Sequence, residues 1–219
     1  NGADLGLAFD GDADRVVMAD ETGALVDGDQ ILACIARHWQ QEGKLQGGQV
    51  VSTVMANAGM AAYLAGHDIE LLRTPVGDRH VIQKMREENL NVGGEPSGHL
   101  ILGEHATTGD GLAAALEVLA VLCSGHWDRA SAALHPYAPF PQLLRNVRID
   151  GAARDILDRT EIARALAQAE TSLAAEQGRL VVRPSGTEPL IRVMAEAREA
   201  GLVEETVQRL CAEIERCAG

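Results

Sequence analysis

Short apolar runs alternate along the first part of the chain with segments whose apolar residues recur every three or four positions. The runs predict strands, because each holds strand-forming residues between turn residues; they lie at 5–9, 15–20, 49–53, 69–72 and 91–93. The recurring pattern predicts helices, for example where Ile31, Ile35 and Trp39 fall four residues apart. This alternation is typical of an α/β domain, so we expect a mixed or parallel sheet with helices on both faces.

Polar residues in front of the periodic segments predict where helices begin. Asn57, Asp78 and Asp110 each stand at such a position, where a side-chain oxygen can accept a hydrogen bond from the first turn. The segment after Asp110 is strongly apolar, with leucines at 112, 116, 119 and 122. Gly43 and Gly66 predict the ends of two earlier helices.

A proline-rich stretch at residues 135–142 interrupts the pattern. It holds three of the seven prolines, and proline both lacks a backbone donor and restricts the residue before it. We therefore expect an inter-domain linker, followed by a smaller α+β C-terminal domain at 143–219. Its expected strands are 143–149, 179–182 and 190–196, and its expected helices are 158–173 and 202–217.

The charge of the chain limits the partners it can bind. It carries 19 Lys+Arg against 32 Asp+Glu, a formal net charge of −13, and residues 1–136 alone hold 8 basic and 19 acidic residues. Such a chain is a poor candidate for binding nucleic acid or an anionic membrane, and no apolar run approaches the roughly 18–20 residues that span a bilayer. The four cysteines, at 34, 123, 211 and 217, form no CxxC pair, so we expect reduced thiols and a cytoplasmic protein.

The first candidate site is an acidic loop between the first two expected strands, Asp10-Gly11-Asp12-Ala13-Asp14-Arg15. Carboxylates at alternate positions of a tight loop can converge on one hard cation through oxygen ligands. The spacing resembles half of a calcium-binding EF-hand, but Arg15 stands where that motif needs glycine, and strands flank the loop. Three carboxylates beside an arginine suit Mg²⁺ that faces a phosphate. A solvated acidic turn is the alternative.

The second candidate site is the glycine-rich loop at residues 93–99 (GGEPSGH). Its glycines allow the backbone to approach a ligand closely. Glu95, Ser97 and His99 can exchange hydrogen bonds with hydroxyl groups. An ordinary turn after a strand is the alternative interpretation.

The third candidate site is the loop at residues 183–189 (RPSGTEP), with Arg192 after it. A loop of Ser, Gly and Thr offers backbone N–H groups and two hydroxyls to an anion. Arg183 and Arg192 add charge-assisted donors on either side. The alternative is a polar hairpin tip.

In this order the loops resemble those of the α-D-phosphohexomutase superfamily. The acidic loop is similar to the family's magnesium loop, residues 94–99 to its sugar-recognition loop, and residues 183–189 to its phosphate-binding loop. Shorter matches extend the resemblance over essentially the whole chain: VDGDQI (26–31), VGDRHV (76–81), TTGDG (107–111) and PLIRVMAEA (189–197). The combination of VGDR, TTGDG and FPQLLRNV (140–147) looks most like the bacterial phosphoglucosamine mutases.

The resemblance implies a domain order and a reaction. Residues 1–24 would be the tail of the family's second domain, 25–134 the third domain, 135–142 a linker and 143–219 the fourth, phosphate-binding domain. A phosphoserine in the first domain donates its phosphoryl group to the sugar phosphate, and the enzyme takes back the other group from the resulting bisphosphate. The implied reaction is an isomerisation between glucosamine 6-phosphate and glucosamine 1-phosphate.

The resemblance also implies a role for each candidate residue. Asp10, Asp12 and Asp14 would hold Mg²⁺, and Arg15 would be the catalytic residue that contacts the phosphoryl group. Glu95 and Ser97 would bind sugar hydroxyls, with His99 beside them. The non-reacting phosphate would be held by Arg183, Ser185, Gly186, Thr187 and Arg192.

Two departures from the family pattern bear on activity. The family's serine loop, a Thr-Ala-Ser-His-Asn-Pro-like stretch, is absent from this sequence, so we expect the chain to begin inside a longer protein and to be inactive alone. Pro75 stands where many members carry a lysine, so no lysine contact is expected there. Two alternative functions stay open: a phosphomannomutase or phosphoglucomutase, and a non-catalytic calcium-binding module. Formation of a homo-oligomer by the longer protein is also open.

Overall fold

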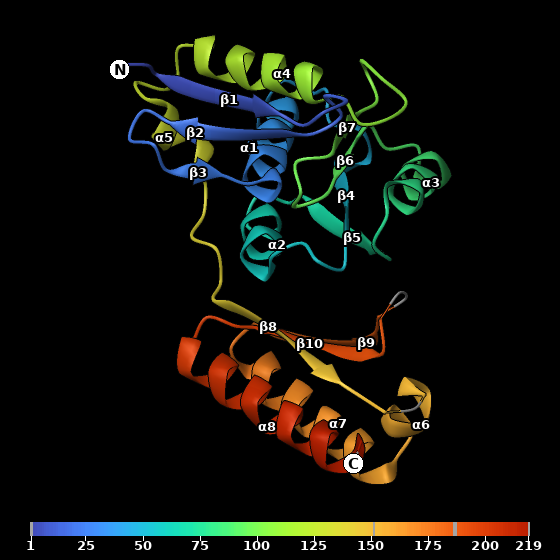
Figure 1. Ribbon diagram of the computed structural model, residues 1–219. Helices are drawn as coiled ribbons and strands as arrows, with labels where there is room; N and C mark the ends of the chain where they lie inside the picture. Colours follow the sequence, from blue (N-terminus) through green and yellow to red (C-terminus); the bar gives the residue numbers. More distant parts are fainter. Residues whose placement is uncertain (1, 151, 186–187, 219) are drawn as a thin grey trace. The chain divides into compact units, whose positions relative to one another are not determined.

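The computed structural model describes residues 2–150, 152–185 and 188–218. The chain divides into two compact units, the first ending at Ala138 and the second beginning at Pro139 (Figure 1). Each unit has its own buried apolar cluster, so each is described by itself.

The described part of the first unit holds two sheets (Figure 1). One is antiparallel in the order β1-β2-β3, with strands Leu5–Phe9, Val16–Asp20 and Leu25–Val26. The other has the order β5-β4-β6-β7, with strands Glu70–Thr74, Gln49–Thr53, Val92–Gly94 and Leu100–Leu102. In it β4 runs parallel to β5 and β6, whereas β7 is antiparallel to β6. The expected mixed sheet is confirmed.

Helices cover both faces of the four-stranded sheet. The helical segments are α1 (Gly28–Gln41), η1 (Gln46–Gly48), α2 (Ala58–Ala65), α3 (Asp78–Glu88), α4 (Gly111–Cys123) and α5 (Ala130–Leu134). Neighbouring residues of β4 point to opposite faces: Val50 joins the core cluster of Ile31, while Val51 packs with Val81 and Met85 of α3. Among the described residues, no helix is long and apolar enough to cross a membrane.

Two of the three expected helix caps are confirmed. Asn57 accepts a hydrogen bond from the Gly59 backbone N–H, and Asp110 accepts one from Ala113. The prediction for Asp78 is wrong, because Gly77 occupies the N-cap with a φ of 125° and Asp78 is the first helical residue. A backbone at that φ is strained for any residue with a side chain, so the local conformation selects the glycine as the cap.

The second unit is a three-stranded antiparallel sheet covered by helices in its described part (Figure 1). The strand order is β8-β10-β9, with strands Gln142–Arg148, Leu190–Glu196 and Arg179–Pro184. The helices are α6 (Ala153–Leu157), α7 (Thr160–Ala175) and α8 (Ala200–Ala218). Val203, Val207 and Ile214 of α8 are buried, as their spacing predicts. The smaller α+β domain is confirmed, although β9 continues two residues beyond the expected strand and takes in Arg183.

Helix α4 exposes most of its leucines. Leu112, Leu116 and Leu119 lie at the surface, while Ala115 and Val118 are among the small residues that face the core. Strand β1 adds to this surface, because Leu7 and Phe9 are each 40% exposed and β1 is paired with β2 alone among the described strands. Large apolar patches of this kind mark surfaces that a partner or a further domain covers.

We predict that two acidic substitutions two residues apart on α4 have very different effects. Val118→Glu buries a charge without a partner and is expected to lower the free energy of unfolding by roughly 3–5 kcal/mol. Leu116→Glu changes a side chain that is 57% exposed, so its effect should stay within about 0.5 kcal/mol. Urea unfolding followed by circular dichroism measures both. Equal destabilisation by the two variants would contradict this orientation of α4.

Asp20, at the end of β2, makes the first unit sensitive to acid. Its carboxylate accepts hydrogen bonds from the Thr22 hydroxyl and backbone and from the Ala24 backbone, and it lies 3.0 Å from His135 Nε2. The Thr22 hydroxyl is the largest cause that lowers the pKa of Asp20 from 3.8 to about 2. Because the folded pKa lies below the unfolded one, this stabilisation is complete above pH 4 and is lost between about pH 4 and pH 2.

We expect the substitution Asp20→Asn to lower the stability of the chain at neutral pH and to flatten its dependence on pH between about pH 4 and pH 2. Unfolding followed by circular dichroism measures both effects. Asp128 is exposed, so Asp128→Asn should leave the pH profile of stability unchanged.

Candidate functional site

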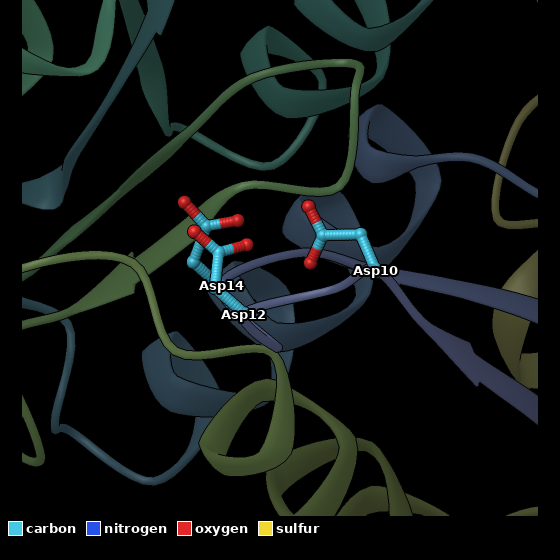
Figure 2. Close-up of side chains that lie close together, drawn as sticks. All are labelled: Asp10, Asp12 and Asp14. Carbon is cyan, nitrogen blue, oxygen red and sulfur yellow. The ribbon is translucent and has the colours of Figure 1, made fainter.

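The acidic loop is the connection between the antiparallel strands β1 and β2. One ligand atom each from Asp10, Asp12 and Asp14 can be chosen so that all lie within 4.8 Å of one another. Figure 2 shows the carboxylates of Asp12 and Asp14 close together, with the Asp10 carboxylate facing them. The turn is closed by the Ala13 N–H, which donates to the Asp10 carbonyl at 3.2 Å, and Ala13 itself has a φ of 58°. The left-handed backbone at Ala13 bends the loop so that the three aspartate side chains converge. Their alternation in the sequence predicts this convergence.

The donor set of this loop fits a hard divalent cation. All candidate ligands are carboxylate oxygens, which Mg²⁺ prefers. Arg15 offsets part of the charge, with Nε 3.8 Å from Asp10 Oδ2 and 3.7 Å from Asp14 Oδ1. Yet Asp14 Oδ1 is buried and has no hydrogen-bond partner among the described residues. One arginine cannot neutralise three carboxylates, so the loop retains negative charge, and within the described part Asp14 Oδ1 has only the long contact with Arg15 in place of a hydrogen bond. A cation would satisfy both.

The loop at residues 93–99 lies directly against the acidic loop. The Val16 N–H donates to the Gly98 carbonyl at 3.1 Å, and Arg15 forms a β-bridge with His99. Ser97 is exposed, Glu95 is half-buried and His99 is 4% exposed, with its Nδ1 3.2 Å from Asp14 Oδ2. The fold therefore brings together two loops that are about eighty positions apart in the sequence.

Two glycines permit this close approach. Gly98 lies in the second candidate site, whereas local sequence patterns did not identify Gly28 as part of a site. A Cβ on Gly98, whose φ is 88°, would overlap the carbonyl oxygen of Val16. A Cβ on Gly28, at the start of α1, would overlap the carbonyl oxygen of Glu95, and the Gly28 N–H donates to Pro96 at 3.1 Å. Only glycine leaves room for backbone against backbone at these points. The sole sequence signal for a role of Gly28 was its place in the stretch VDGDQI, which is similar to the family.

The N-cap of α3, Gly77, also reaches the glycine-rich loop. The Gly77 N–H donates to Glu95 Oε1 at 3.1 Å. This bond holds one carboxylate oxygen of Glu95 and leaves the other available to a ligand. Pro75, next to this contact, is exposed.

In the second unit the two arginines of the third candidate site face each other. Arg183 on β9 and Arg192 on β10 are directly opposite in the antiparallel register, so their side chains share one face of the sheet. Like charges in this position repel. Ser185 Oγ and Arg192 Nε are both buried and without a hydrogen-bond partner among the described residues. Gly186 and Thr187 lie outside the described residues. Only one carboxylate of the part that the structure describes is near the pair, with Arg192 Nη2 4.0 Å from Glu188 Oε2. The described part thus offers two unpaired donors and an excess of positive charge, which an anion would satisfy.

Two family models match the chain. Residues 27–138 match the phosphoglucomutase/phosphomannomutase alpha/beta/alpha domain III, and residues 144–213 match the C-terminal domain of the same family. A phosphoglucosamine mutase from Sphingopyxis alaskensis is 52% identical over 211 residues, which are 96% of this chain and 47% of the relative. The phosphoglucosamine mutase of Rhodospirillum rubrum is 55% identical over 216 residues, 98% of this chain and 47% of the relative. The chain thus spans about half the length of these relatives.

Solved structures share the fold. An N-acetylglucosamine-phosphate mutase described in a substrate complex is 26% identical, with a TM-score of 0.73 over 95% of this chain and 48% of that one. The N-acetylphosphoglucosamine mutase of Aspergillus fumigatus, described in complex with GlcNAc-6P and magnesium, is 22% identical, with a TM-score of 0.74 over 97% of this chain and 49% of that one. The two family models together cover most of the chain, and the chain therefore belongs to the phosphoglucomutase/phosphomannomutase family of the α-D-phosphohexomutase superfamily.

Proposed function

We propose that this chain is part of a phosphoglucosamine mutase, which interconverts glucosamine 6-phosphate and glucosamine 1-phosphate. The observation that carries the proposal is the packing of the acidic loop against the loop at residues 93–99, through the Val16–Gly98 backbone bond. That packing sets the three carboxylates proposed to bind a cation beside groups whose chemistry suits sugar hydroxyls. Identity of 50–55% to enzymes of this name over nearly the whole chain supports the choice within the family.

The acidic loop would serve the phosphoryl group that moves. Asp10, Asp12 and Asp14 would hold Mg²⁺, which when bound neutralises charge on a transferring phosphoryl group. Arg15 is half exposed at this loop, so its guanidinium can leave its loose ion pairs and donate to the same group. These roles use charge and position only, which is what phosphoryl transfer requires of the protein.

The loop at residues 93–99 would orient the sugar. The oxygen of Glu95 that Gly77 does not hold can accept a hydrogen bond from a sugar hydroxyl, and the exposed Ser97 can donate or accept one. His99 stands behind them, against Asp14. Two ligand-facing groups on a loop fixed by backbone contacts would hold the hexose in one orientation relative to the cation site.

The second unit would hold the phosphate that does not react. Ser185 Oγ and Arg192 Nε would offer their unpaired donors, and Arg183, opposite Arg192, would add positive charge. The proposal also includes Gly186 and Thr187 of the same sequence stretch. Binding energy from this distant group would orient the reacting end of the sugar.

The phosphoryl donor would be a phosphoserine in another part of the longer protein, with a sugar bisphosphate as the intermediate. The described cysteines are all free, which agrees with the proposal of a cytoplasmic protein.

We predict opposite effects of Arg192→Met on binding and on stability. Loss of a charge-assisted donor should weaken binding of glucosamine 6-phosphate to this chain about tenfold or more. Loss of repulsion from Arg183 should leave the melting temperature of the ligand-free chain unchanged or raised. Calorimetry gives both values, and Arg154→Met, which removes a surface arginine whose side chain is 88% exposed, is the matched control. If Arg192→Met binds glucosamine 6-phosphate as tightly as the original chain, Arg192 is not part of the phosphate site.

We predict that this chain alone does not interconvert the two glucosamine phosphates, because its sequence holds no family serine loop. The longer protein should do so with a higher kcat/KM than for the glucose or mannose phosphates. A coupled isomerisation assay with the three sugars decides between the proposed function and a phosphomannomutase or phosphoglucomutase. Turnover by the chain alone would show that the phosphoryl donor lies within it.

A further inference from the structure

His99 comes from the glycine-rich loop, yet its side chain is turned to the acidic loop. It is 4% exposed, and its Nδ1 lies 3.2 Å from Asp14 Oδ2. The other Asp14 oxygen, Oδ1, is the buried one that lacks a hydrogen-bond partner among the described residues. A group that holds Oδ2 therefore fixes the direction of Oδ1.

We propose that His99 is a positioning residue for the cation site: by holding Asp14 Oδ2 it orients Oδ1 toward the cation and links cation binding to the glycine-rich loop. The inference rests on the proposed function, since it requires that the acidic loop bind a divalent cation. In this proposal the side chain of His99 contacts Asp14 and does not bind the sugar.

The ring of His99 is held in this orientation by packing. Its backbone carbonyl accepts a hydrogen bond from the Glu95 N–H at 2.9 Å, and an isolated β-bridge to Arg15 fixes the position of its backbone. Behind the ring stands Gly109, which is buried, and a Cβ there would overlap the Nε2 and Cε1 atoms of His99. Gly109 thus leaves the space that the imidazole occupies.

The contacts of the two ring nitrogens favour one tautomer. Nδ1 faces a carboxylate oxygen, whereas Nε2 is buried and has no partner within the described residues. A buried N–H without an acceptor is costly. A proton on Nδ1 presents a donor to Asp14, and leaving Nε2 without a proton avoids that cost. A histidine that orients a carboxylate in this way acts on the metal through its ligand.

The contact has a thermodynamic consequence, because it joins side chains of two loops. A ligand that orders Glu95 and Ser97 also orders the backbone that carries His99, and therefore Asp14. Coupling of this kind is reciprocal. Sugar phosphate should raise the affinity of the chain for the cation, and the cation should raise the affinity for sugar phosphate by the same factor.

The test measures Mn²⁺ binding to this chain by electron paramagnetic resonance, with Mn²⁺ as a probe for Mg²⁺. His99→Leu removes the donor and should weaken Mn²⁺ binding about tenfold or more. His99→Asn keeps a donor near the place of Nδ1 and should stay within about threefold of the original. His126→Leu, at an exposed histidine, is the control. If the original chain binds no Mn²⁺, the proposed cation loop fails; if it binds and His99→Leu binds equally well, the positioning role fails.

A Gly109→Ala variant tests the same role without replacing His99. The added methyl group should displace the ring and weaken Mn²⁺ binding as His99→Leu does, and it decides the question if His99→Leu does not fold. Combining Gly109→Ala with His99→Asn should restore binding, because asparagine lacks the ring atoms that the methyl group would strike. Normal Mn²⁺ binding by a folded Gly109→Ala variant, or a ¹⁵N spectrum with the His99 proton on Nε2, would overturn the proposal.

Discussion

The contact of the Gly98 backbone with the backbone of Val16 is the constraint on which the candidate site depends. One hydrogen bond of 3.1 Å joins the two backbone segments, and a Cβ on Gly98 would overlap the Val16 carbonyl oxygen. Through this contact the glycine-rich loop and the acidic loop become one structural unit, although they belong to different sheets. Without it neither the β-bridge of Arg15 with His99 nor the approach of His99 to Asp14 would form.

An excess of charge of one sign is found at one place in each unit. Three carboxylates converge at the acidic loop with one arginine beside them, and two arginines stand opposite each other in the second unit. Each arrangement is unfavourable in the free protein, since like charges repel. In the proposed function, a cation bound at the acidic loop and a phosphate bound at the two arginines would offset these repulsions. The net charge of −13 gives no sign of the paired arginines in the second unit.

Much of the fold could be predicted from the sequence because the signals are local. The strands with clear apolar runs, the long helices and the N-caps at Asn57 and Asp110 are confirmed. The short elements β3, α5 and α6 were missed, since two to five residues give no periodic signal. The cap at Asp78 was wrong because the left-handed backbone at Gly77 outweighs the capping preference of an aspartate.

By itself the sequence determined the residue types at the candidate site: alternating carboxylates for a cation, hydroxyl-binding groups on a glycine loop, and arginines around a small polar loop. Only the tertiary structure decided which of them meet. The register of β9 and β10 places Arg183 opposite Arg192. The side chain of His99 faces Asp14 because two hairpin loops pack backbone to backbone. It also decided that α4 buries Val118 and exposes Leu116. Register and packing depend on residues far apart in the chain, which a local pattern does not encode.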